Sequence, residues 1–128
     1  VTDTTRAKDL SISLSPFTFA EAKVSNNEWM QIGLASDTLS GFMMPFDATI
    51  VGVTIHCENT HNITKTFNLF IDGNSQGSIG QLSGNQEQTF RDMALDIDVN
   101  QDEKLRIRSG AGGTIEDTIV TLWLRWRA

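Results

Sequence analysis

Apolar and polar residues alternate at successive positions over most of this chain, and this pattern limits the folds open to it. In the stretch 48–57, Val51, Val53 and Ile55 share one face and His56 lies on the other. A repeat of two residues places successive side chains on opposite faces of a β-strand. No segment carries the sustained, capped apolar stripe that an amphipathic helix requires. The chain is therefore predicted to be all-β.

The same alternation predicts further strands, joined by turns at short intervals. For example, Met93, Leu95, Ile97 and Val99 are predicted to share one buried face. The Asp72–Gly73 dipeptide follows an alternating run, and it is a hairpin signal because glycine supplies the positive φ of tight turns. The other strands are predicted to begin near Leu10, Glu28, Phe67, Ser78, Leu105 and Thr118. Many short strands with frequent turns predict an antiparallel two-sheet jelly-roll or β-sandwich.

The length and the cysteine content fit one domain held together by its own core. A chain of 128 residues has room for a single core. Residues 10–128 are predicted to form one β-sandwich, and residues 1–9, which show no alternation, an N-terminal arm or a connection to a preceding stem. The single cysteine, Cys57, excludes an intramolecular disulfide and a cysteine-rich zinc site. Cys57 is expected to be a small buried side chain.

Charge and hydropathy argue against two classes of partner. The formal net charge is -6 at pH 7, whereas binding to nucleic acid through phosphate neutralisation needs clustered lysine and arginine. No apolar run approaches the length of about 20 residues that crosses a bilayer. Neither nucleic-acid binding nor membrane insertion is expected.

No arrangement of side chains in the sequence predicts catalysis or a cofactor. Cys57 and His56 are neighbours, but alternation sends their side chains to opposite faces, so they do not form a nucleophile and base pair. His56 and His61 flank Glu58 without matching a compact metal-ligand spacing. The chain is therefore predicted to be non-enzymatic, with no metal and no cofactor.

The acidic stretch 96–103 matches only the first half of a calcium-binding loop. Gln101 stands where such a loop requires glycine, and Ile107 stands where a bidentate glutamate closes the coordination sphere. Asp96 and Asp98 are predicted to form the solvent side of a strand, and an oxygen-ligated cation is the alternative.

The tryptophans admit two interpretations. Trp29 and Trp123 could stack on sugar rings, or they could pack in the core or in a subunit interface, where indoles are also enriched. The last strand is apolar on one face and mixed on the other, which is typical of a central strand or of one that faces a partner. Trp123 and Arg125, on the mixed face, are predicted to lie in a subunit interface.

Strand and turn rhythm over residues 42–126 resembles the small β-sandwich knob domains of bacteriophage virions. The resemblance rests on the segments 42–53, 67–73 and 99–107 and on the final apolar strand. Such knobs are similar to the trimeric jelly rolls of the tumour-necrosis-factor and complement type. The resemblance implies a homotrimer located on the phage particle.

These observations lead to one principal hypothesis for the function. The chain is predicted to be a virion module, the trimeric knob of a tail needle, fibre or spike that attaches to the host cell through a surface glycan or protein. Polar loops with adaptable hydrogen bonding are expected to make the contact. The candidate contact residues are Glu58, Asn59, His61, Asn62, Asn74 and Gln76.

Two alternatives keep the fold and change the role. One is a capsid decoration protein that stabilises the phage head, anchored by the arm 1–9. The other is a carbohydrate-binding module of an extracellular enzyme, with Trp29 or Trp123 as the sugar platform.

Overall fold

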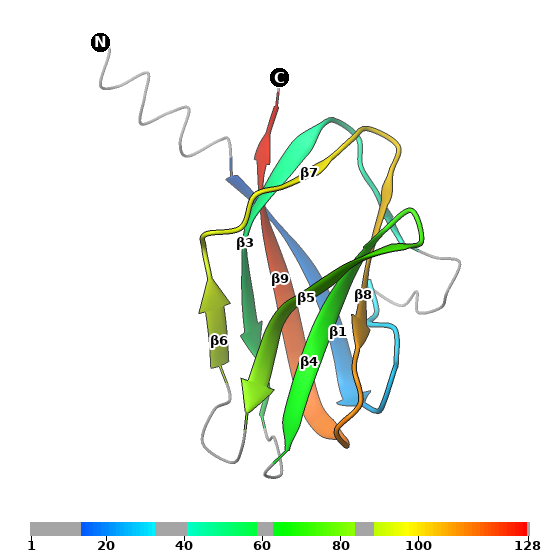
Figure 1. Ribbon diagram of the computed structural model, residues 1–128, viewed down its shortest axis with the longest axis vertical. Helices are drawn as coiled ribbons and strands as arrows, with labels where there is room; N and C mark the ends of the chain where they lie inside the picture. Colours follow the sequence, from blue (N-terminus) through cyan, green and yellow to red (C-terminus); the bar gives the residue numbers. More distant parts are fainter. Residues whose placement is uncertain (1–13, 33–40, 59–62, 84–88, 128) are drawn as a thin grey trace.

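The computed structural model describes residues 14–32, 41–58, 63–83 and 89–127, and over these ranges the chain forms only strands, turns and irregular segments (Figure 1). The strands are β1 (Leu14–Val24), β2 (Phe42–Met43), β3 (Ala48–His56), β4 (Thr64–Ile71), β5 (Asn74–Ser83), β6 (Thr89–Asp92), β7 (Ile97–Val99), β8 (Lys104–Ser109) and β9 (Ile115–Trp126). Within the described ranges, no helix is long and apolar enough to span a membrane. The all-β prediction is confirmed.

The strands form two antiparallel sheets whose order is that of a jelly roll. In one sheet, here called the β9 sheet, the order is β1-β9-β3-β6, and β7 also pairs with β3. In the other, the β8 sheet, the order is β2-β8-β4-β5. The chain passes back and forth between the sheets, as in the double Greek key of a jelly roll. The predicted two-sheet architecture is confirmed; the predicted arm 1–9 lies outside the described residues.

The core lies between the sheets and is built mostly from the faces that alternation predicts. The prediction is wrong at Val51, because the ladder has an irregularity between Ile50 and Gly52 that leaves Ile50 fully buried and Val51 half-buried. Val53 and Ile55 of β3, like Leu122 and Leu124 of β9, are almost completely buried. Cys57 is buried too, as expected. Burying one aliphatic side chain of this size contributes about 1.5–3 kcal/mol relative to leaving it exposed. The hydrophobic core therefore provides the main stabilisation of the sandwich.

Met93 departs from the predicted buried face. Its side chain is 39% exposed, whereas Val99 is fully buried. The expectation is wrong at Met93 because the chain leaves the strand ladder between β6 and β7, and the period of two does not hold across that gap. The Met93 sulfur instead lies over Gly52, where a Cβ atom would come within 2.3 Å of it. The methionine therefore covers β3 from outside.

Lys65 is the one charged residue in the described ranges that is completely buried. Its ammonium group donates to the carbonyl oxygens of Gly110 at 2.9 Å and Gly113 at 2.5 Å, and to Asn26 Oδ1 at 3.1 Å. Burial lowers the pKa of Lys65, and the carboxylate of Glu28 acts in the opposite direction. These three acceptors use the three donors of an ammonium group, so Lys65 ties the connection between β8 and β9 to β4.

Candidate functional site

The loop residues proposed from the sequence do not form one surface. Glu58 follows β3 and lies close to the start of β4, whereas Asn74 and Gln76 lie at the beginning of β5. Because β4 runs the length of the sandwich between these points, the two groups lie at opposite ends (Figure 1). The other candidates from that loop, Asn59, His61 and Asn62, lie outside the described residues.

At the Glu58 end, carboxylates gather beside the start of β9. A hydrogen bond with Asp117, followed by repulsion from Asp117 and Glu116, raises the pKa of the exposed Glu58. The backbone at Asp117 has a positive φ of 45°, and both Glu116 and Asp117 are exposed. These three residues are called the acidic corner below. It is a place where one carboxylate takes up a proton more readily than usual.

Two acidic residues of the stretch 96–103, Asp98 and Glu103, hydrogen-bond to protein groups. Asp98 accepts a hydrogen bond from Thr49 Oγ1 at 2.8 Å and lies 3.9 Å from Arg127 Nε. Glu103 accepts a hydrogen bond from the backbone N–H of Asn100 at 2.5 Å. In the part of the chain that the structure describes, no three histidine, cysteine or acidic side chains are placed to share a metal ion. The Asp98 carboxylate thus joins β7 to β3, and the Glu103 carboxylate closes the turn that follows β7.

The outer face of the β8 sheet carries a row of basic side chains. Lys104, Arg106 and Arg108 alternate along β8 with Leu105 and Ile107, which are fully buried. The three cations therefore point away from the core on one strand of a chain whose net charge is -6. This basic row departs locally from the negative charge of the whole chain.

Trp29 crosses this row. Its backbone pairs with Arg108 at the edge of β8, and its ring centroid lies 4.8 Å from that of Phe70 on β4, the strand on the other side of β8. The indole must therefore extend over β8. The guanidinium carbon of Arg106 lies 4.3 Å from the Trp29 ring centroid, and that of Arg108 lies 5.4 Å away. Both distances are within the range of cation–π attraction.

The indole fixes the positions of two guanidinium groups on this surface. Arg108 also donates from Nε to the carbonyl oxygen of Asn27 at 3.2 Å. Arg106 Nη1 is buried and has no hydrogen-bond partner among the described residues. The face of Trp29 partly offsets the cost of that unmade bond, because a π face attracts a cation. Asn68, paired with Arg108 across the ladder, adds an amide to the same surface. We call these residues, with Phe70 and Lys104, the arginine–tryptophan face.

The sequence indicated the residues of this face but not their combination. In the sequence, Trp29 is a candidate sugar platform, and the three basic residues 104, 106 and 108 alternate with Leu105 and Ile107. Their contact depends on residues near 29 lying beside β8, a long-range pairing that no local pattern specifies.

Trp123 and Arg125, proposed for a subunit interface, lie on the outer face of the other sheet. Trp123 is half-buried, and its indole N–H donates to Thr54 Oγ1 at 3.1 Å, which holds the ring against β3. Arg125 is exposed. Figure 1 places β9 between β1 and β3, so both residues lie in the middle of their sheet and not at an edge.

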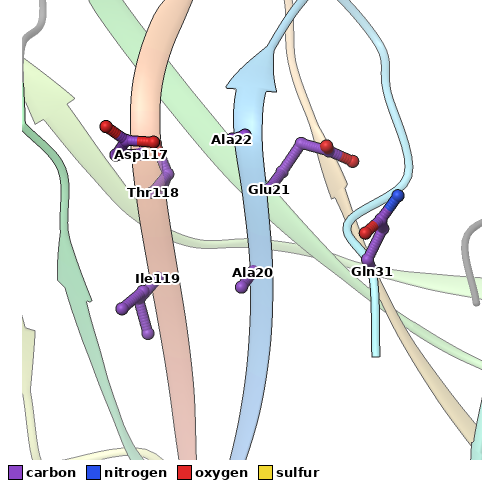
Figure 2. Close-up of a pocket in the computed structure, with 7 residues that line it drawn as sticks. All are labelled: Ala20, Glu21, Ala22, Gln31, Asp117, Thr118 and Ile119. Atoms are coloured by element: carbon purple, nitrogen blue, oxygen red, sulfur yellow. The ribbon is translucent and has the colours of Figure 1, made fainter. Parts of the chain in front are cut away.

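A shallow hollow of about 240 Å³ lies on the same outer face, where β1 presents alanines. Ile119 of β9, Ala20 of β1 and Gln31 are paired side by side, so their side chains share this face. Figure 2 shows Ala20 and Ala22 between Ile119 and Asp117 on one side and Gln31 on the other. The methyl groups leave space that larger side chains would fill.

No protein-family model matches the chain, and no curated protein matches it. Among solved structures, the chain is similar to FLHE, with 14% identity, 88% of this chain and 98% of that chain covered, and a TM-score of 0.46. It is also similar to a family 35 carbohydrate-binding module from Clostridium thermocellum, with 8% identity, coverage of 85% and 97%, and a TM-score of 0.44. A third is the nucleoplasmin-like N-terminal domain of Drosophila FKBP39, with 7% identity, coverage of 88% and 91%, and a TM-score of 0.44. Likenesses at this level identify neither a family nor a function, and the expected resemblance to phage knobs is supported only as a jelly-roll fold.

Proposed function

We propose that this chain is a non-enzymatic binding module that recognises acidic glycans on the arginine–tryptophan face. The observation that carries the proposal is the stacking of Arg106, at 4.3 Å, and Arg108, at 5.4 Å, against the single indole of Trp29. Holding guanidinium groups in place before binding reduces the entropy lost when a ligand is bound.

The chemistry of this face favours an anionic ligand. Arginine presents a planar set of donors that matches carboxylate, sulfate and phosphate groups. Lys104 adds a further cation to the row. The negative charge of the whole chain repels an extended polyanion, so the face suits a ligand with a few anionic groups better than a nucleic acid.

The same face carries groups that suit sugars. Asn68 and Thr66 lie next to each other on the outward side of β4, and each is partly exposed. Amide and hydroxyl groups exchange hydrogen bonds with sugar hydroxyls, and the partly exposed ring of Phe70 offers apolar surface to sugar C–H groups. A uronic-acid, sulfated or phosphorylated oligosaccharide combines the two chemistries.

The arginine–tryptophan face favours one of the functions predicted from the sequence over the others. All of its residues come from one chain, so a single copy provides a complete binding surface. A carbohydrate-binding module works in this way, and we therefore place it before the trimeric attachment knob, whose binding would depend on avidity between copies. Attachment of a virion through the same face is the second candidate.

The test compares acidic and neutral oligosaccharides by isothermal titration calorimetry. We expect wild-type protein to bind an acidic oligosaccharide. Its affinity for the neutral counterpart should be lower by about tenfold or more. Arg108→Gln and Trp29→Ala should each weaken the acidic ligand about tenfold. Arg91→Gln, the same change on the exposed surface of β6, is the control and should bind like wild type.

Several outcomes would overturn the proposal. Equal affinity for neutral and acidic sugars would show that the arginines do not recognise the anionic groups of the ligand. An Arg108→Gln variant that binds as wild type does would show the same. Tighter binding of a single-stranded oligonucleotide than of any acidic sugar would assign the face to nucleic acid. Thermal unfolding of each variant establishes that a loss of binding is not a loss of fold.

A further inference from the structure

Exposed apolar side chains gather on the outer face of the β9 sheet, opposite the arginine–tryptophan face. Leu14 of β1 is 41% exposed and Ile119 of β9 is 46% exposed. Trp123 and Pro16 are paired neighbours on the same face. Leu14, Pro16 and Trp123 thus adjoin toward one end of the face, and Ile119 lies beyond the paired Thr18 and Thr121. Apolar side chains grouped on an exposed face commonly mark an interaction site.

The order of side chains along β9 has a two-fold chemical symmetry. Beginning at its acidic end, the outward residues are Asp117, Ile119, Thr121, Trp123 and Arg125. Along this outward row, an acidic residue is followed by an apolar residue and then by the hydroxyl of Thr121 at the centre. A second apolar residue and a basic residue come after it. Reversing the strand about Thr121 places acid opposite base and apolar opposite apolar.

The neighbouring strand β1 has the matching asymmetry in size. Near the acidic end it presents Ala20 and Ala22, which form the hollow shown in Figure 2. Near the basic end it presents Leu14 beside Arg125, and Pro16 beside Trp123. The face therefore has a hollow at one end and a projection at the other, both on the same strand.

We infer that this face binds a second copy of the chain across a two-fold axis, with the two β9 strands antiparallel and Thr121 on the axis. The register that follows places Asp117 opposite Arg125 of the second copy and Ile119 opposite its Trp123. Ala22 then lies opposite Leu14 of the second copy, so the projection of each copy enters the hollow of the other. Each interface patch is its own complement, as an isologous dimer requires.

Charge selects this orientation over the parallel one. A two-fold axis along β9 would set Asp117 opposite Asp117 and Arg125 opposite Arg125. Like charges placed opposite each other across an interface are costly. In the antiparallel arrangement, Arg125 of the second copy meets the acidic corner, where a hydrogen bond with Asp117 and repulsion from the neighbouring carboxylates raise the pKa of Glu58. A cation brought there relieves that repulsion.

This dimer does not depend on the proposed glycan binding, because the two faces lie on opposite sheets. It leaves both arginine–tryptophan faces open and points them away from each other. It differs from the homotrimer expected from the sequence, in which a three-fold axis would join the copies head to tail.

Charge exchange between two variants provides the test, with sedimentation equilibrium as the measurement. Wild-type protein should be a dimer at about 100 µM. Asp117→Arg and Arg125→Asp each create like-charge pairs at both ends of the interface and should raise the dimer Kd about tenfold or more. An equimolar mixture of the two variants restores opposite charges at both ends and should form a 1:1 dimer. A closed ring of three cannot alternate the two variants, so restoration separates a dimer from a trimer.

Because Asp117 has a positive φ, Asp117→Arg could fail to fold. Two further variants test the dimer at positions other than Asp117. Ile119→Lys places a charge opposite Trp123 of the second copy and should also give monomers. Met43→Lys, at a side chain 57% exposed on the β8 sheet, should remain dimeric. A wild-type monomer at about 100 µM, a wild-type trimer, or a mixture that stays monomeric would each overturn the inference.

Discussion

The ammonium nitrogen of Lys65 lies 2.9 Å from the carbonyl oxygen of Gly110, inside the sandwich. The bond joins β4 to the connection between β8 and β9. Replacing Lys65 by methionine keeps an unbranched side chain without the ammonium group, and it leaves the carbonyls of Gly110 and Gly113 without this donor. We expect Lys65→Met to lower the free energy of unfolding by about 1–3 kcal/mol in urea titration. Lys23→Met, at an exposed position of β1, is the matched control and should change it by less than about 0.5 kcal/mol. Equal effects of the two substitutions would refute a role for the buried ammonium.

Gly112 is expected to tolerate alanine less well than Gly77. Both have positive φ, 126° at Gly112 and 84° at Gly77. A Cβ atom at Gly112 would lie 2.2 Å from the carbonyl oxygen of Thr64, whereas at Gly77 nothing lies within 4 Å. Gly77→Ala should cost about 1–2 kcal/mol through backbone conformation alone. Gly112→Ala adds a clash with backbone and should lower the midpoint of thermal unfolding further. A smaller loss at Gly112 would contradict the geometry of this loop.

The acidic corner predicts a gain of stability on mild acidification. Hydrogen bonding to Asp117 and repulsion from Asp117 and Glu116 raise the pKa of Glu58 above its ordinary 4.5, so the folded chain binds a proton more readily than the unfolded chain. The stabilisation is complete below pH 4.5 and is lost as the pH rises through the raised pKa. Glu58→Gln should therefore be more stable than wild type at neutral pH, and the difference should shrink in acid. Urea titration across this pH range measures it, with Asp96→Asn as a charge-matched control. A difference that does not vary with pH would show that the raised pKa of Glu58 beside Asp117 is not the cause.

Binding of an acidic glycan should weaken as salt is added. The arginine–tryptophan face holds its cations near the surface, where they are screened over a Debye length of about 10 Å at 0.1 M salt. Raising sodium chloride from about 50 to about 200 mM should weaken binding at least about threefold. Lys104→Gln should bind less tightly and respond less to salt. An affinity that is constant across this range would indicate that apolar contacts dominate.

Alternation along the chain predicts the strands well, because the faces it defines are buried by the hydrophobic effect. Alternation also places Lys65 on the same inward face of β4 as Phe67 and Leu69. A lysine at the start of a strand is normally taken as a surface residue. Its acceptors at Gly110 and Gly113 are distant in sequence, so no local pattern specifies the buried position.

The position of each strand in its sheet depends on pairings between distant segments. β9 lies between β1 and β3, which come from the other half of the chain. The same limit applies to the candidate sites. The sequence provides Trp29 and Arg108 but not their contact, and it groups Glu58 with Asn74 by composition although β4 separates them.

The pairing of β1 with β9 also determines how this domain responds to force. Leu14 is the ladder partner of Arg125, so the two ends of the described sandwich lie side by side. Tension applied at these two points acts along the hydrogen bonds of the ladder, which run perpendicular to the strands. The hydrogen-bonded residue pairs between β1 and β9 therefore separate one after another from that end, and each pair in turn bears the whole force. Pulled at its two ends, the jelly roll yields at its outermost ladder while the interior of the sandwich is still intact.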